Sequence, residues 1–261
     1  MRYAVSIPPF TDPDTVVEMA REAEAAGWDG VFLWDHLQWS PEHKPDVFDP
    51  WVLLGAIATS TQRVRIGTLV TPLSRRRPQM IAKHLTTLDH LSGGRVTLGV
   101  GLGEPAHDDF GAFGDEPDAR VRAQLLDESL AILDDLLRGS RSSHQGEHFS
   151  VDAQLRPGPV QQPRLPIWVA GVLPHRRPLR RARAWDGVVP IGSDDLITPS
   201  TLADYLGEAP PAGWDVVSPW SPGVPAHEYA DVGVTWLFQS ATPTGDWVDE
   251  LRRRIRGGPM V

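Results

Sequence analysis

Short apolar segments alternate with helical segments along the first 140 residues of the chain, with a repeat of about 30 residues. Strands are expected at 2–7, 29–34, 63–70 and 95–100. The segments that follow them have helical spacing and are 13–26, 50–61, 78–92 and 119–138. Strands that alternate with helices run parallel, so this order predicts a parallel sheet covered by helices.

The second half of the chain continues the pattern less regularly. Further strands are expected at 166–170, 186–190, 213–218 and 233–238, and helices at 176–184, 199–206 and 245–256. Eight strands in 261 residues favour a single-domain (β/α)8 barrel over an open doubly wound sheet. Residues 140–165 are expected to form a short insertion after the fourth helix, with a hairpin around 144–151.

Composition excludes several classes of protein. The chain has no cysteine, so it contains no disulfide, no thiolate metal ligand and no cysteine nucleophile. Its net charge of -9 argues against nonspecific nucleic-acid binding. The apolar runs are too short for a membrane helix, and Pro8 follows the start too closely for a signal peptide. We therefore expect a cytoplasmic protein that acts on a small molecule.

In a parallel barrel, ligands bind at the carboxyl ends of the strands. That rule selects a short set of candidate residues from four of the expected strands. They are Asp35 and His36, then Thr68, Leu69 and Val70, then Gly101, Gly103 and Glu104, and finally Gly171, Val172, His175, Arg176 and Arg177.

His36 and Glu104 are the pair best suited to moving a proton. An imidazole titrates near neutral pH, and an apolar site can raise the pKa of a carboxyl group. Both residues follow strands on the same rim, so they are expected to face one ligand. The alternative is structural: Asp35 and His36 cap the next segment, and Glu104 pairs with an arginine.

Two glycine-containing loops suggest contact with a ligand. The spacing of Gly99, Gly101 and Gly103 is G-x-G-x-G, which differs from a dinucleotide fingerprint and suits close approach of the backbone to a flat ligand. Gly171 to Arg177 precede an expected helix, where free N–H groups favour an anion such as a phosphate. The alternative for this loop is a solvated basic turn.

Other polar clusters are assigned to the surface. They are the arginine runs 75–77 and 252–254, the helical pair Lys83 and His84, and the group His144, Glu147 and His148. The last group has loosely metal-like spacing, but it lies in the expected hairpin, so no metal site is predicted.

The stretch from Pro50 to Gly103, PWVLLGAIATSTQRVRIGTLVTPLSRRRPQMIAKHLTTLDHLSGGRVTLGVGLG, resembles the luciferase-like flavin-dependent oxidoreductases. The segments EAEAAGWDGVFLWDHL and WVAGVLPHRRPLRRARAWDGVVP resemble the same family. The resemblance covers about residues 1–140 and 163–192. It implies a (β/α)8 barrel that uses reduced FMN with oxygen, or the deazaflavin coenzyme F420 as a hydride carrier.

The resemblance also implies roles for individual residues. His36 matches a histidine near the reactive ring in F420-dependent members, and Glu104 matches a carboxylate beside it. Leu69 and Val70 match a bulged strand with a cis peptide behind the ring. The loop from Gly171 to Arg177 matches the region that holds the cofactor phosphate.

Three functions remain open from the sequence. The first is an FMN-dependent monooxygenase acting on a small organic substrate, with a separate flavin reductase as a partner. The second is an F420-dependent dehydrogenase or reductase that uses His36 and Glu104 for proton transfer. The third is a flavin-binding protein without activity. The resemblance further implies a homodimer.

Overall fold

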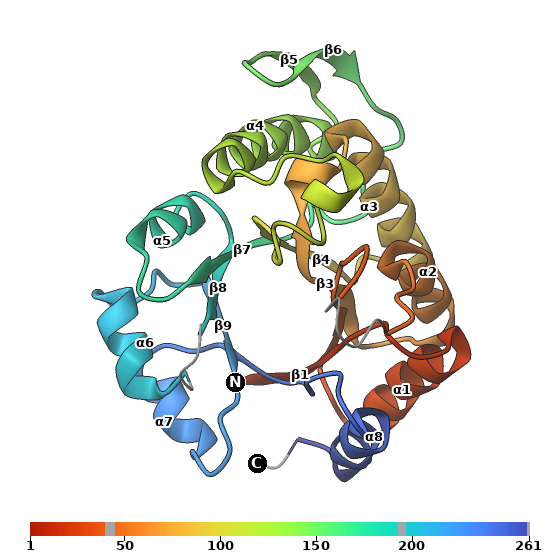
Figure 1. Ribbon diagram of the computed structural model, residues 1–261, viewed down its shortest axis with the longest axis vertical. Helices are drawn as coiled ribbons and strands as arrows, with labels where there is room; N and C mark the ends of the chain where they lie inside the picture. Colours follow the sequence, from red (N-terminus) through yellow and green to blue (C-terminus); the bar gives the residue numbers. More distant parts are fainter. Residues whose placement is uncertain (40–44, 193–196, 260–261) are drawn as a thin grey trace.

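The computed structural model describes residues 1–39, 45–192 and 197–259. Within these residues, eight parallel strands close into a barrel, with helices around the outside (Figure 1). The barrel order is β1, β10, β9, β8, β7, β4, β3, β2. The strands are β1 (Arg2–Ile7), β2 (Gly30–Leu33), β3 (Arg65–Pro72), β4 (Val96–Gly101), β7 (Ile167–Val172), β8 (Gly187–Ile191), β9 (Asp215–Pro219) and β10 (Trp236–Gln239). The predicted fold is confirmed.

The helices follow the strands as the sequence pattern predicts. They are α1 (Pro13–Ala25), α2 (Pro50–Ser60), α3 (Pro78–Ser92), α4 (Ala119–Leu137), α5 (Arg176–Ala182), α6 (Pro199–Leu206), α7 (Ala226–Asp231) and α8 (Trp247–Gly257). α2 begins where the Asp49 side chain accepts hydrogen bonds from the N–H groups of Trp51 and Val52. α3 ends at Gly93, which adopts the left-handed conformation. The six-residue α7 was not predicted.

The insertion forms a two-stranded hairpin, β5 (Arg141–Gln145) and β6 (Ser150–Gln154), which projects beyond α4 (Figure 1). The turn of this hairpin is held by Glu128 of α4, whose carboxylate accepts hydrogen bonds from the three successive N–H groups of residues 147–149. Its Oε2 also lies 3.1 Å from Nε2 of His144. Of His144, Glu147 and His148, only His144 therefore uses its side chain to hold the turn, and the other two act through their backbone N–H groups. Among the described residues, no three His, Cys, Asp or Glu side chains group as metal ligands would.

The barrel interior is filled by side chains of alternating strand residues. They are Ala4, Phe32, Leu69, Trp168, Val189, Val217 and Trp236. The ring of Trp168 lies 5.3 Å from Phe32 and 5.5 Å from Trp236, measured between centroids, so large aromatic rings occupy the barrel axis. A filled interior leaves the two ends of the barrel as places for a ligand.

A larger apolar cluster lies between the barrel and the helices. In the part of the chain that the structure describes, no helix is both long and apolar enough to cross a bilayer.

Candidate active site

The carboxyl ends of the barrel strands are called the barrel mouth below. Near this end, strand β3 is irregular. The pairing of β3 with β4 shifts register between Thr68 and Thr71, and the peptide between Leu69 and Val70 is cis. The bulge and cis bond expected at Leu69 and Val70 are thus confirmed. Glycines on β4 make room for this segment. A Cβ at Gly99 would lie 2.3 Å from the carbonyl oxygen of Thr68, and one at Gly101 would lie 2.9 Å from Cγ2 of Val70.

Apolar side chains at the ends of β7 and β8 remain open to solvent. Val172 and Ile191 are opposite each other in register and are 36% and 39% exposed. They follow Ala170 and Val189 by two residues, and those residues pack inside the barrel. Because side chains alternate along a strand, Val172 and Ile191 point to the same inner face. The barrel mouth therefore offers an apolar surface that a flat ligand can cover.

Asp35 lies directly after β2 and is buried, and both of its carboxylate oxygens accept hydrogen bonds from other residues of the protein. It accepts hydrogen bonds from Trp51 Nε1 at 3.1 Å and Thr71 Oγ1 at 2.8 Å. Arg75 and Arg76 each donate to its Oδ1, at 2.9 and 2.7 Å. Burial alone would raise the pKa of Asp35, but the two guanidinium charges outweigh it and lower the pKa below 3.8.

Asp35 and Thr68 therefore have a different role from the predicted contact with a cofactor. Asp35 is 1% exposed and Thr68 is fully buried. The Thr68 hydroxyl donates to the carbonyl oxygen of Gly99 and lies 3.0 Å from the Thr71 hydroxyl, whose proton goes to Asp35. With their polar atoms bonded inside the protein, both residues brace β2, β3 and β4.

His36 stands at the barrel mouth beside a carboxylate that the sequence analysis did not select. Its Nδ1 lies 3.1 Å from Oδ2 of Asp109, and its side chain is 15% exposed. The N–H groups of Leu37 and Gln38 donate to the other oxygen, Oδ1, at 2.6 and 3.2 Å. Asp109 comes from the loop after β4, so it ties the end of β2 to that loop.

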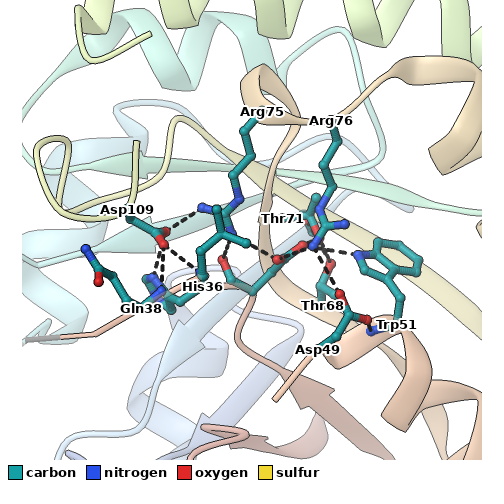
Figure 2. A network of polar contacts seen from close by, with 12 residues as sticks. His36, Gln38, Asp49, Trp51, Thr68, Thr71, Arg75, Arg76 and Asp109 are labelled. Atoms are coloured by element: carbon teal, nitrogen blue, oxygen red, sulfur yellow. Dashed lines mark hydrogen bonds and ion pairs between the residues drawn. The ribbon is translucent and has the colours of Figure 1, made fainter. Parts of the chain in front are cut away.

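Arg75 joins this pair to Asp35. Its guanidinium donates to Asp109 Oδ2, to Asp35 Oδ1 and to the carbonyl oxygen of Asp35 (Figure 2). The side chain is 2% exposed, and that of Arg76 is 17% exposed. The prediction that residues 75–77 form a solvated face is wrong for these two arginines. The buried carboxylates of Asp35 and Asp109 form ion pairs with the two guanidinium groups and so compensate their charge.

Aromatic rings surround the imidazole of His36. The ring of Trp39 lies 4.8 Å away and those of Phe10 and Trp34 6.1 Å away, all between centroids. Trp34 Nε1 donates to the Ser6 hydroxyl at 2.9 Å, which fixes its ring at the end of β1. The histidine thus has an apolar wall on one side and a carboxylate at one nitrogen.

Glu104 lies apart from His36. Its Oε1 is 3.3 Å from Nη2 of Arg122, and its Oε2 accepts the N–H of Ala106 at 2.9 Å. The side chain is 70% exposed. The structural alternative, a pair with an arginine, is the arrangement that the structure contains. The carboxylate that contacts His36 is that of Asp109, where Glu104 was expected.

Gly103 is required by packing in the same loop. Its φ is +83°, and a Cβ there would lie 2.5 Å from Cζ of Phe110. The guanidinium carbons of Arg122 and Arg75 lie 4.6 and 5.3 Å from the centre of the Phe110 ring. Cation–π contacts of this kind hold the loop against the barrel, so Gly103 acts on the loop's shape rather than on a ligand.

The loop after β7 divides into two groups of residues. Arg176 donates to the carbonyl oxygens of Asp204 and Tyr205, so its guanidinium is engaged by α6 and is unsuited to the predicted phosphate contact. A Cβ on Gly171 would collide with Pro178, which gives that glycine a packing role. His175 and Arg177 are exposed and remain candidates for an anion. Burial raises the pKa of Tyr205, the α6 residue beside Gly171, to about 12.

Three charged residues of the site escaped the sequence analysis, namely Asp109, Arg75 and Arg122. Asp109 lies in the loop 105–118, which has no periodic pattern. Arg122 is 1% exposed within a helix whose spacing is otherwise amphipathic. An arginine at a position that helical spacing assigns to the buried face was the one available signal.

Comparison with known proteins places the chain in a family. The model of the luciferase-like monooxygenases matches residues 1–215. The chain belongs to the luciferase-like monooxygenase family. The resemblance found in the sequence is thereby confirmed.

The curated proteins whose sequences resemble this chain include F420-dependent dehydrogenases. The F420-dependent glucose-6-phosphate dehydrogenase of Microbacterium testaceum is 40% identical over 163 residues, which cover 60% of this chain and 46% of that protein. The F420-dependent hydroxymycolic acid dehydrogenase of Mycobacterium tuberculosis is 34% identical over 228 residues, covering 84% and 59%. The chain spans about half the length of the curated relatives it matches.

Solved structures share the barrel at low identity. An F420-dependent secondary alcohol dehydrogenase in complex with an F420–acetone adduct has a TM-score of 0.77 and 18% identity, over 97% of both chains. A monooxygenase from Streptomyces bottropensis has a TM-score of 0.76 and 18% identity, over 98% of this chain and 97% of the other. At such identity the likeness establishes the fold.

The residues at the barrel mouth fit the ring of a flavin or deazaflavin. The exposed apolar pair Val172 and Ile191 provides an apolar contact for the ring. Gly101 is buried against Val70, so it supports this surface from below. The phosphate end fits through fewer groups than the sequence predicted, because α6 engages Arg176. Among the described residues of the loop after β7, the exposed groups His175 and Arg177 remain as candidates.

Proposed function

We propose that the protein is an F420-dependent oxidoreductase, acting as a dehydrogenase or reductase on a small organic molecule. The observation that carries the proposal is His36, an imidazole at the barrel mouth with one nitrogen held by a buried carboxylate. A histidine so held has its second nitrogen available to accept a proton and return it. The names of the curated relatives, which are F420-dependent dehydrogenases, support the same choice of cofactor.

In the direction of alcohol oxidation, bound F420 would supply the acceptor that takes a hydride from the substrate carbon. Nε2 of His36 then accepts the hydroxyl proton, and the electron pair of the broken O–H bond becomes the second bond of the carbonyl. The reverse reaction returns the proton from the imidazolium. The aromatic rings of Phe10, Trp34 and Trp39 exclude water from one side of this transfer.

The other proposed contacts divide by the parts of the cofactor. Val70 and Val172 would lie along the ring, with Gly101 beneath Val70, and His175 and Arg177 would meet the phosphate. Leu69 is 8% exposed, so it supports the ring site from within the barrel.

An FMN-dependent monooxygenase is the second candidate. The family model that matches the chain carries the name monooxygenase, and the apolar mouth suits chemistry that requires exclusion of water. A separate flavin reductase would then supply reduced FMN. A protein that binds flavin without turnover is the third.

Fluorescence titration with F420 and with FMN, each oxidised and reduced, tests the proposal. We expect tighter binding of F420 than of FMN. Preference for reduced FMN would favour the monooxygenase, and binding of neither cofactor would refute both enzymes.

A further inference from the structure

We propose that Asp109 is the positioning residue of His36: it holds the neutral imidazole in the tautomer that carries its proton on Nδ1 and leaves Nε2 free to accept one. The sequence resemblance assigns the carboxylate near His36 to Glu104, and the geometry assigns it to Asp109. The inference deepens the proposed function, because it rests on His36 as the group that moves the proton.

The contacts of Asp109 determine which atom carries the proton. Its two oxygens face four donors or potential donors: two backbone N–H groups on Oδ1, and Arg75 Nη1 and His36 Nδ1 on Oδ2. Burial alone would raise the pKa of Asp109, but the contact with His36 and the charge of Arg75 outweigh it and lower the pKa below 3.8. An ionised carboxylate only accepts hydrogen bonds, so Nδ1 of His36 must donate.

The surrounding charges keep this arrangement stable. Asp35 and Asp109 are balanced by Arg75 and Arg76, so the buried group is neutral when His36 is neutral. Arg75 bonds both carboxylates, and its guanidinium cannot turn from Asp109 without leaving a buried anion underpaired. Oδ2 of Asp109 is therefore fixed in front of the imidazole before any ligand binds.

Glu104 has none of these properties. It is 70% exposed, and its two oxygens are engaged by Arg122 and by the N–H of Ala106. A solvated carboxylate in that position does not fix the orientation of an imidazole.

Asp109→Asn is the informative exchange because it keeps the shape of the side chain and adds an amide NH₂. The backbone N–H groups of Leu37 and Gln38 must still meet an oxygen, so the NH₂ replaces Oδ2. It then faces both His36 and Nη1 of Arg75, whose Nη2 keeps its bonds to Asp35. Nδ1 then becomes the acceptor, and the proton moves to Nε2, which loses its ability to act as a base.

The first measurement uses the cofactor-free, full-length protein. Long-range ¹⁵N–¹H correlation spectra at a pH where His36 is neutral report which ring nitrogen carries the proton. The chain has nine histidines, and the signal absent from His36→Gln identifies His36. We expect the Nδ1–H form in the wild-type protein and the Nε2–H form in Asp109→Asn. An Nε2–H form in the wild type overturns the proposal, whether or not the variant folds.

The second measurement is F420 reduction by a substrate, with Asp108→Asn as the matched control. Asp108 is the adjacent residue, and its carboxylate contacts His107 at 3.2 Å rather than His36. Asp109→Asn should lower kcat about 10²- to 10⁴-fold with unchanged F420 affinity, and Asp108→Asn should leave kcat unchanged. Equal kcat in the two variants overturns the proposal. Failure of the wild-type protein to bind F420 refutes the proposed function instead, since the tautomer measurement needs no cofactor.

Discussion

Asp35→Asn tests whether the buried charge network holds the barrel mouth together. The substitution keeps the side-chain shape but removes a negative charge that faces Arg75 and Arg76. Arg75 retains Asp109 and the carbonyl oxygen of residue 35. Among the described residues, Arg76 retains Asp49, which is half exposed and 3.7 Å away, so the charge of Arg76 is poorly compensated.

The expected cost follows from that loss. Breaking a buried pair by removing one partner costs about 3–5 kcal/mol of unfolding free energy. Unfolding 261 residues carries an entropy of roughly 0.55 kcal/mol/K near 60 °C, so the melting temperature should fall by about 5–9 °C. The control is Asp127→Asn, which weakens an exposed pair with Arg181 and should cost about 0–1 kcal/mol.

The pH dependence gives an independent check of the same variant. The pKa of Asp35 is lower in the folded protein than in the unfolded chain, so its stabilisation is complete above the unfolded value of about 3.9. It is lost as the pH falls through the folded value. Differential scanning calorimetry should show a difference between wild type and Asp35→Asn that is constant from pH 7 to 5 and narrows only below about pH 4. Equal melting temperatures for Asp35→Asn and Asp127→Asn at pH 7 would refute the reasoning.

Four further outcomes are expected. His36→Gln should lower kcat about 10²- to 10⁴-fold while F420 still binds, and unchanged turnover would remove His36 from the mechanism. Gly103→Ala should lower the melting temperature, because φ is positive and the new Cβ meets Phe110; an unchanged melting temperature would contradict this. Arg177→Ala should weaken a phosphorylated cofactor more than its dephosphorylated form, and equal weakening would count against a phosphate contact. Light scattering should give a dimer, and substituting the exposed Val52 of α2 and Met80 of α3 by Lys should yield a monomer if these helices form the interface.

The barrel itself was predictable because its signal is local. Each strand of the first half is an apolar run. Each helix shows apolar residues at helical spacing, with a proline at its start or a glycine at its end. The predicted strand 63–70 was placed two residues early, since the bulge after Thr68 extends β3 to Pro72. α7 was missed because it is a single short helix amid prolines, with too few residues to show a period.

The site was predictable only in part because its partners are distant in the sequence. A run of three arginines gives no sign that Arg75 turns inward while Arg77 stays in solvent. What decides it is the 3-10 turn η1 (Leu73–Arg75) after the bulge, and two carboxylates 40 and 34 residues away. Glu104 and Asp109 follow the same strand, and only the folded loop around Phe110 shows which of them meets His36.

Anaerobic reduction of F420 by a panel of small alcohols, followed by the loss of cofactor absorbance, tests the central claim most directly. The account predicts reduction without oxygen, with one carbonyl product formed per F420 reduced and the rate lost in His36→Gln. No F420 reduction, together with formation of an oxygenated product from substrate, oxygen and reduced FMN that requires the protein, would contradict it.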